Sequence, residues 1–223
     1  HPARLLEGLP AESLTMAGTL PERVVIEEDG LKFVVALGTG QKTGFYFDQR
    51  ENRVAAGLMA KGRSVLDLYC YTGGFALHAA RAGALRVVAV DSSGPALELA
   101  RESARLNGLE GKVVFEEGDA DGILEEFGAA RRQLMPDMVI IDPPSLVPAR
   151  KHLPQAVKAY VRLNSNALRL LSGQGVVVSS SCSHHVSRET FVDILRESAG
   201  RAQKQARLLE LRGAAKDHPV LLT

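Results

Sequence analysis

The protein has 223 residues, 45% of them hydrophobic, which suffices for one well-buried main domain and a small appendage. Its 27 Lys and Arg residues nearly balance its 26 Asp and Glu residues, which excludes a global charge that would attract nucleic acid or a membrane. The two cysteines form no spaced disulfide framework, and no apolar run reaches the roughly 18 residues of a membrane span. We therefore predict a soluble, cytoplasmic protein without membrane contact. Because the chain begins with His1 and not with Met, we expect a piece of a longer polypeptide.

The N-terminal part of the chain predicts a hairpin and then a helix. Residues 23–37 alternate around Asp29-Gly30, a dipeptide suited to a two-residue turn, and their candidate buried face is Val24, Ile26, Phe33 and Val35. Asp48 can cap a following helix, with Glu51 completing a capping box, and that helix should run to about Ala60. We assign residues 1–44 to the remnant of a small hairpin-containing domain and residues 45–223 to the main domain.

From Ser64 onward, strands and helices alternate. The predicted strands are Ser64 to Tyr69, Arg86 to Val90, Val113 to Glu117, Met138 to Ile141, Gly175 to Ser180 and Ala206 to Leu211. The predicted helices lie near Phe75 to Ala82, Pro95 to Asn107, Ile123 to Phe127, Gln155 to Leu171 and Arg188 to Arg201. Repeated βαβ units predict an α/β fold, a Rossmann-like, doubly wound, mostly parallel sheet.

Two tripeptides with chemical potential directly follow predicted strands. Asp142-Pro143-Pro144 follows one apolar run, and Ser181-Cys182-Ser183 follows another. Ligands of open α/β sheets bind outside the carboxyl ends of the strands, so we expect the acid and the thiol to share one crevice. A nucleophilic sulfur with a carboxylate beside it can attack an electron-poor ring.

A glycine-bearing turn, Asp67 to Phe75, separates the first parallel strand from its helix, as in nucleotide-binding α/β folds. By itself this turn is a weak signal. Cys70 and Ala76 stand where a dinucleotide fingerprint would have glycines, and the chain has no P-loop Gly-Lys-Ser. A cofactor without phosphates fits this turn better.

Acids end four successive strands: Asp67, Asp91, Asp119 and Asp142. Asp91 is placed to accept the hydroxyls of a ribose, and Asp119 to meet an adenine amino group. Each acid could instead cap the helix that follows it. Four acids in register with the glycine turn favour a cofactor site typical of S-adenosylmethionine-dependent methyltransferases of the Rossmann-like class.

One longer motif makes a closer resemblance. The run from Gly40 to Arg53, together with Asp67 to Phe75, Asp142-Pro143-Pro144, Ser181-Cys182-Ser183 and Asp217-His218-Pro219, resembles the bacterial 23S ribosomal RNA large subunit methyltransferase I family and its K/L-type relatives. The resemblance implies S-adenosylmethionine as cofactor and large-subunit ribosomal RNA as partner, and it leaves a homodimer open. The cofactor-binding residues that we predict are Phe47, Gln49, Arg50, Asp67, Tyr69, Tyr71, Gly73, Gly74, Asp91, Ser92, Asp119, Ala120, Asp142 and Pro143. Members of that family carry an N-terminal RNA-binding PUA domain.

Within this wider group the reacting sulfur separates the reactions. Cytosine C5 needs a thiolate to add at C6 before it can take a methyl group, whereas guanine N7 needs none. Cys182 therefore favours a cytosine-C5 methyltransferase, with Cys182 and Asp142 as catalytic residues and Asp142 at the ring N3 edge. Ser145 stands where two-cysteine RNA cytosine methyltransferases have a second cysteine and where close relatives have Lys, so the proton-abstracting base stays unassigned.

Several other interpretations stay open. Cys182 could be a small buried residue at a strand end, in a guanine-N7 or other methyltransferase, and the chain could bind cofactor and RNA without turnover. A nicotinamide oxidoreductase is a further, weaker alternative. His184 and His185 lack the partners of a metal site, so we expect no metal. The basic clusters Arg131-Arg132 and Arg150-Lys151-His152 are solvated loops or phosphate contacts.

Overall fold

The computed structural model describes residues 17–38, 40, 44–129, 135–147 and 150–219. Its centre is a five-stranded sheet in which all neighbouring strands are parallel, in the order β5-β4-β3-β6-β7. These strands are β3 (Ser64–Leu68), β4 (Arg86–Asp91), β5 (Val113–Glu117), β6 (Met138–Ile141) and β7 (Val176–Ser179). The predicted Rossmann-like fold is thus confirmed.

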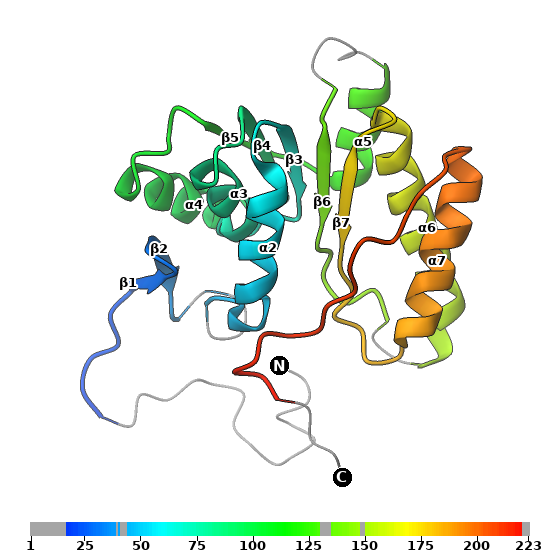
Figure 1. Cartoon of the computed structure of the whole chain (residues 1–223). Helices are drawn as coiled ribbons and strands as arrows, with labels where there is room; N and C mark the ends of the chain where they lie inside the picture. Colours follow the sequence, from blue (N-terminus) through cyan, green and yellow to red (C-terminus); the bar gives the residue numbers. More distant parts are fainter. Residues whose placement is uncertain (1–16, 39, 41–43, 130–134, 148–149, 220–223) are drawn as a thin grey trace.

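Helices cover both faces of the sheet (Figure 1). They are α2 (Arg50–Ala60), α3 (Gly74–Arg81), α4 (Gly94–Leu106), α5 (Ala120–Ala129), α6 (Leu153–Leu170) and α7 (Arg188–Ala202), with short 3-10 turns η1 (Phe47–Gln49) and η3 (Arg150–His152). Helices α2, α3 and α4 share one core cluster with the sheet, whereas α5 and α6 share the other. Helix α7 packs on α6 and forms an outer layer.

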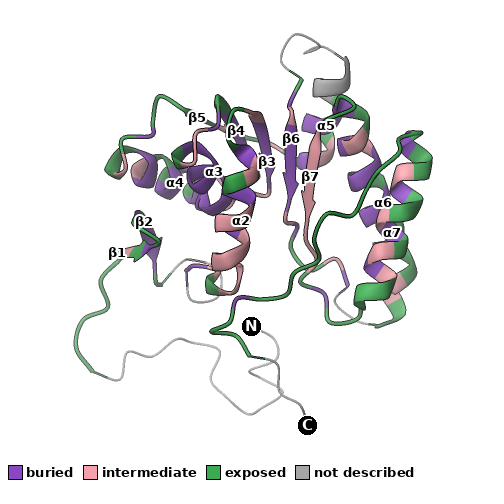
Figure 2. Cartoon of the chain, viewed as in Figure 1, coloured by how far each residue is buried: buried purple, intermediate pink, exposed green. Residues whose placement is uncertain are grey.

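The strand sequences explain this layering. Successive side chains of a strand point to opposite faces, so Val65 packs in the first cluster and Leu66 in the second. Met138 and Val139 on β6 divide in the same way. Because both faces are covered, the central strands are almost entirely buried (Figure 2) and mostly apolar, with Asp67 on β3 as a buried exception.

The predicted hairpin consists of β1 (Arg23–Glu28) and β2 (Leu31–Ala36), which pair antiparallel around Asp29 and Gly30. Both turn residues have positive φ angles, 47° and 75°, as a two-residue hairpin turn requires. Phe33 is fully buried in the same cluster as the sheet, and the backbone N–H of Val34 donates to Ser103 Oγ on α4 at 2.9 Å. The hairpin therefore packs directly on the main sheet's helices.

Two predictions about local structure were wrong. Residues 206–211 do not form a strand: they pair with no strand among the described residues, and Leu208 and Leu209 are exposed. Asp48 does not cap a helix, because it lies inside η1 and α2 begins at Arg50 without a side-chain cap. The chain takes a tight 3-10 turn at this point, and that turn moves the start of α2 beyond the reach of Asp48.

The strand order places the candidate site. From β3 the chain adds β4 and β5 on one side, and it then crosses to add β6 and β7 on the other. Ligands of such sheets bind at the carboxyl ends of the strands where the order reverses, which here is between β3 and β6. No helix in the described part of the chain is long and apolar enough to cross a membrane.

Candidate active site

The glycine-bearing turn after β3 has an unusual backbone. Tyr69, Tyr71 and Gly73 all have positive φ angles, of 64°, 50° and 81°. For the two tyrosines this left-handed conformation costs on the order of 1–3 kcal/mol each, so the surroundings must impose it. The N–H groups of Cys70 and Tyr71 are held by the carbonyl of Val90 and by the carboxylate of Asp91. The turn is therefore held in place by the end of the neighbouring strand β4.

Asp91 and Asp119 lie at the ends of β4 and β5, as predicted, beside a small pocket. The pocket is lined by Tyr69, Val90, Asp91, Ser92, Gly118, Asp119 and Ala120. The Asp91 carboxylate accepts hydrogen bonds from the backbone N–H groups of Tyr71 and Ser93, at 2.8 and 2.9 Å. Asp119 accepts from two N–H groups in the first turn of α5, at 3.1 and 3.2 Å, so it caps this helix as well as lining the pocket.

Asp67 lies beneath this turn and is fully buried. Neither of its carboxylate oxygens has a hydrogen-bond partner within ordinary limits. Burial, and next the nearby charge of Asp142, raise the pKa of Asp67 well above its usual range, and the N–H of Ala76 offsets this only in part. The surroundings of Asp67 therefore favour its neutral form far more than water does.

Asp142 follows β6 at the switch point. The side-chain amide of Gln49, from η1, donates to Asp142 Oδ1 at 3.1 Å. Burial raises the pKa of Asp142 to about 6, against the lowering effects of the Arg53 charge and of hydrogen bonds from Ser180 and Gln49. Asp142 retains some solvent-accessible surface, so the carboxyl group is both shielded and reachable. Its protonation can change near neutral pH.

Cys182 lies next to Asp142-Pro143-Pro144, as the sequence predicted. The Cys182 side chain is exposed, and its Sγ lies 3.9 Å from the carbonyl oxygen of Pro143. Hydroxyl groups fix the flanking serines: Tyr160 on α6 lies 2.9 Å from Ser181 Oγ and 3.4 Å from Ser183 Oγ. Ser145, the residue after the two prolines, is hydrogen-bonded to Ser183, with 3.2 Å between the two Oγ atoms. Hydrogen bonds of the two flanking serines therefore hold the Cys182 backbone beside the Asp142-Pro143-Pro144 segment.

Three further predicted cofactor residues, Phe47, Arg50 and Gly74, do not line the pocket at Asp91. Phe47 is 43% exposed and packs edge-on against Phe45, and Arg50 pairs with Asp217 at 3.2 Å. Gly74 is buried, and a Cβ atom there would lie 2.8 Å from Arg53 Nε. Among these three residues, the structure joins neither Phe47 nor Arg50 to the pocket at Asp91.

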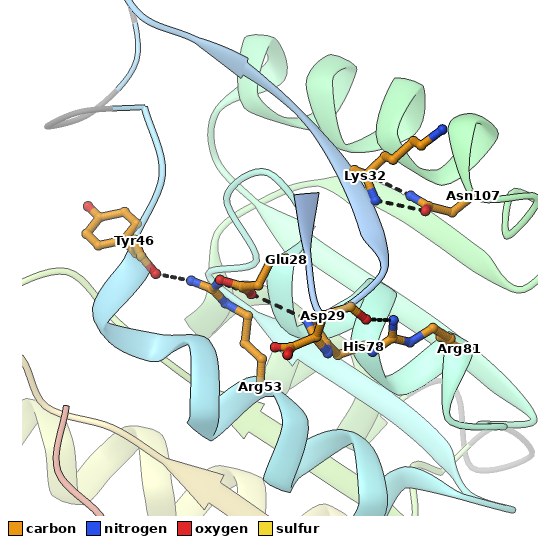
Figure 3. A network of polar contacts seen from close by, with 8 residues as sticks. All are labelled: Glu28, Asp29, Lys32, Tyr46, Arg53, His78, Arg81 and Asn107. Carbon is orange, nitrogen blue, oxygen red and sulfur yellow. Dashed lines mark hydrogen bonds and ion pairs between the residues drawn. The ribbon is translucent and has the colours of Figure 1, made fainter. Parts of the chain in front are cut away.

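A buried ionic cluster near the site was missed by the sequence analysis (Figure 3). Arg53 on α2 pairs with Glu28 at 2.6 Å and donates to the carbonyl of Tyr46, while His78 Nε2 on α3 lies 3.3 Å from Glu28. All three ionisable side chains are at most 3% exposed. Burial alone would raise the pKa of Glu28, but the hydrogen bond with His78 and the Arg53 charge lower it. The cluster ties the hairpin to α2 and α3 and thereby fixes the start of η1.

The same cluster holds a group of candidate metal ligands within the described residues, namely Glu28, Asp29 and His78. The guanidinium of Arg53, however, already neutralises Glu28. A second cation would face that positive charge directly. The chemistry of this donor set therefore favours an ion pair.

Comparison with known proteins decides the family. A family model described as S-adenosylmethionine-dependent methyltransferase matches residues 11–211. The chain belongs to this family. It is 40% identical to the Ribosomal RNA large subunit methyltransferase I of Tolumonas auensis and 39% identical to that of Aeromonas hydrophila, in each case over 97% of this chain and 55% of the relative. The chain thus spans about half the length of these curated relatives, and the predicted resemblance is confirmed.

Solved structures agree with this assignment. The crystal structure of SMU.776 complexed with SAH is 27% identical with a TM-score of 0.80, and the match covers 93% of this methyltransferase chain and 54% of that chain. A SAM-dependent methyltransferase from Agrobacterium tumefaciens has the same fold, with a TM-score of 0.68 over 82% of this chain and 60% of that one. The predicted cofactor is the one that defines the family.

Proposed function

We propose that this protein is an S-adenosylmethionine-dependent methyltransferase that forms 5-methylcytosine in large-subunit ribosomal RNA through a covalent bond to Cys182. The observation that carries this proposal is the position of the exposed Cys182 thiol, 3.9 Å from the carbonyl oxygen of Pro143, the residue that follows Asp142. The similarity to enzymes named Ribosomal RNA large subunit methyltransferase I supports the RNA substrate.

In this proposal the Cys182 thiolate is the nucleophile that activates the cytosine ring. Cytosine C5 is a poor nucleophile, so a thiolate must add to C6, which forms the Sγ–C6 bond and moves electron density toward C5 and N3. C5 can then form a bond to a methyl carbon, and S-adenosylmethionine, when bound, supplies that methyl group in electrophilic form. Loss of the C5 proton to a base that we leave unassigned, and breaking of the Sγ–C6 bond, regenerate the thiolate.

Asp142 donates a proton to N3, at the opposite edge of the ring. Thiolate addition places negative charge on N3, and a protonated carboxyl group there can donate a proton to it. A carboxyl group with an ordinary pKa would be almost fully ionised at neutral pH. Burial raises the pKa of Asp142 to about 6, which leaves it able to deliver a proton under these conditions.

The residues around the glycine-bearing turn fit S-adenosylmethionine. Each oxygen of Asp91 keeps a lone pair after accepting its backbone hydrogen bond, so the carboxylate can still accept from both hydroxyls of a ribose. The buried carboxyl group of Asp67 lies below the turn, with neither oxygen in a hydrogen bond of ordinary geometry, so it could still bond to a ligand. Asp91, Asp119 and their pocket neighbours would hold the nucleoside part of the cofactor.

A basic turn beside the crevice is our candidate for a phosphate contact. Arg150 and Lys151 are exposed in η3, directly before α6 and a few residues after Asp142-Pro143-Pro144. A local pair of cations can bind RNA phosphates even though the chain as a whole is nearly neutral. The second predicted cluster, Arg131-Arg132, lies outside the described residues.

The proposal is tested by trapping the covalent adduct. Ribosomal RNA that contains 5-fluorocytosine is incubated with the protein and S-adenosylmethionine, and the complex is resolved by denaturing electrophoresis. Fluorine cannot leave as a proton does, so a methylated adduct accumulates on the wild-type protein and is absent from Cys182→Ala. Cys70→Ala is the matched control, because Cys70 is buried within the core and should leave the adduct intact.

The outcomes separate the alternatives. Unchanged methyl transfer by Cys182→Ala would exclude the cysteine mechanism and favour a ring nitrogen of guanine as acceptor. Thermal stabilisation by S-adenosylmethionine without transfer of a labelled methyl group to any ribosomal RNA would instead indicate an RNA-binding module without turnover.

A further inference from the structure

A directed chain of hydrogen bonds ends at Asp142. The Nε of Arg212 donates to Asn52 Oδ1 at 3.0 Å, and Asn52 Nδ2 donates to Gln49 Oε1 at 2.7 Å. Gln49 Nε2 in turn donates to Asp142 Oδ1 at 3.1 Å. Four residues from the C-terminal segment, α2, η1 and the end of β6 are thus joined from a cation to a carboxylate.

The groups at the two ends fix the direction of every link, because Arg212 only donates and the Asp142 carboxylate only accepts. The Gly213 carbonyl also accepts from Asn52 Nδ2, at 3.1 Å. A guanidinium has donors and no acceptor, so Asn52 must turn its oxygen toward Arg212. Its amide nitrogen then faces Gln49, which must present its own oxygen to Asn52. The amide nitrogen of Gln49 is left to face Asp142. Without Arg212, the oxygen of Asn52 loses the donor that holds it, and Asn52 then holds Gln49 less firmly against Asp142.

We propose that Arg212, acting through Asn52 and Gln49, is a positioning residue that holds the catalytic carboxyl group of Asp142 in place. This inference rests on the proposed function for its kinetic meaning, but the relay itself does not depend on the identity of the substrate. Two further contacts bring Arg212 to the site: the N–H of Ala215 donates to the carbonyl of Asp48 at 2.8 Å, and Asp217 pairs with Arg50.

The Gln49 hydrogen bond is one of several effects on the pKa of Asp142. Burial has the largest effect and favours the neutral acid, and the Asp48 charge acts in the same direction. The Arg53 charge and hydrogen bonds from Ser180 and Gln49 favour the carboxylate. Asp67, Tyr46 and Cys182 also face this region, since the Asp142 charge acts on Asp67 and the charges of both Asp142 and Cys182 act on Tyr46. A donor that is held in place by a relay keeps the balance of these opposing effects near neutral pH.

The first test measures the titration of Asp142 directly, by carboxyl carbon NMR of the protein without RNA. Asn52→Leu breaks the relay without changing the net charge. Because Gln49 then loses its fixed orientation, we expect the pKa of Asp142 to rise by about half a unit to one unit. Arg212→Met should raise it as well, whereas Arg212→Lys, which retains a donor and the charge, should stay near the wild-type value. Arg207→Met, at another exposed position of the same segment, is the matched control.

The second test follows the pH profile of methyl transfer. In Asn52→Leu and Arg212→Met, the pH at which kcat changes should move upward with the NMR titration, while KM for RNA stays within about twofold. A role limited to folding would lower the amount of active enzyme without moving this profile. Titration of Asp142 at the wild-type pH in Arg212→Met would overturn the proposal, even if Asn52→Leu failed to fold. Because the NMR measurement needs no turnover, this failure is distinguishable from a failure of the cytosine mechanism.

Discussion

Asp67 and Asp142 are two carboxyl groups on adjacent parallel strands, and the charge of Asp142 raises the pKa of Asp67. Asp67 is fully buried without a hydrogen-bond partner, whereas Asp142 accepts from Gln49 and keeps some exposed surface. Their environments therefore differ for two chemically identical groups: full burial raises the pKa of Asp67 well above its usual range, whereas the pKa of Asp142 is raised to about 6. Such separation is typical of functional sites, where burial is retained despite its cost in stability.

Substituting Asp142 should stabilise the folded protein while it abolishes methyl transfer. The pKa of Asp142 is raised from 3.8 to about 6 on folding, so its ionisation opposes folding above pH 6 and has no effect below pH 3.8. Asp142→Asn should therefore increase the free energy of unfolding at pH 8 by up to about 3 kcal/mol. The gain should decrease as the pH falls from 6 to 4.

Urea unfolding of the two proteins at pH 8 and pH 4 checks this expectation. Asp121→Asn is a suitable control, because Asp121 pairs with Arg162 at the surface and its loss should change stability by less than about 1 kcal/mol. An Asp142→Asn protein that is less stable than wild type at pH 8 would contradict the assigned pKa shift.

Gly73 should tolerate no side chain. Its φ angle is 81°, and a Cβ atom would lie 3.2 Å from the Phe115 ring and 3.3 Å from Ala100 Cβ. We expect Gly73→Ala to lower the free energy of unfolding by about 2–4 kcal/mol and to weaken binding of S-adenosylmethionine, because the turn must shift.

Gly62→Ala provides the matched control for this variant. Gly62 has a similar φ angle, 72°, but nothing lies within 4 Å of the added Cβ. The backbone strain should therefore be similar in both variants. The difference between their thermal unfolding temperatures then reports the cost of packing a Cβ atom at Gly73. Equal destabilisation by both substitutions would show that packing against Phe115 has no role.

Asp91 should be essential for binding the cofactor. Its two oxygens accept from Tyr71 and Ser93, and an Asn side chain would place an amide N–H against one of these donors. Asp91→Asn should weaken S-adenosylmethionine binding at least about tenfold, measured by isothermal titration calorimetry. Glu102→Gln, which alters only an exposed ion pair, should bind normally. Wild-type affinity in Asp91→Asn would remove Asp91 from the cofactor site.

The Glu28–Arg53 pair should contribute far more to stability than a surface pair of similar length. Arg53→Met leaves the Glu28 charge buried, so we expect a loss of about 3–5 kcal/mol in the free energy of unfolding. The pair Arg23–Glu102, at 2.9 Å, is largely exposed, and Arg23→Met should cost less than about 1 kcal/mol. Chemical denaturation of both variants at pH 7 makes the comparison, and similar losses would contradict the assigned burial.

The pH dependence of the Glu28 contribution has a defined sign. The pKa of Glu28 is lowered on folding, so its stabilising effect is present above its unfolded value of 4.5 and is lost as the pH falls below that. The stability difference between wild type and Glu28→Gln should therefore decrease from pH 6 toward pH 3. The opposite trend would show that burial, which favours the neutral form, dominates at this position.

The sequence by itself was sufficient for the parallel sheet. Apolar runs such as Met138 to Ile141, separated by amphipathic helices, have one stable arrangement in which both sheet faces are covered. It also predicted that the segments after β6 and β7 lie side by side, and Cys182 Sγ is indeed 3.9 Å from the carbonyl oxygen of Pro143. Patterns of period two and of about four residues encode these features locally.

Only the tertiary structure decided the contacts between distant segments. Glu28 and Arg53 are 25 positions apart in the sequence, and Arg212 and Asn52 are 160 positions apart. The complete burial of Asp67 depends on packing from all sides. Residues 206–211 were predicted as a strand, yet a strand also needs a partner, and none lies among the described residues. Hydrogen-bond partners and desolvation are properties of the folded environment, which no local pattern encodes.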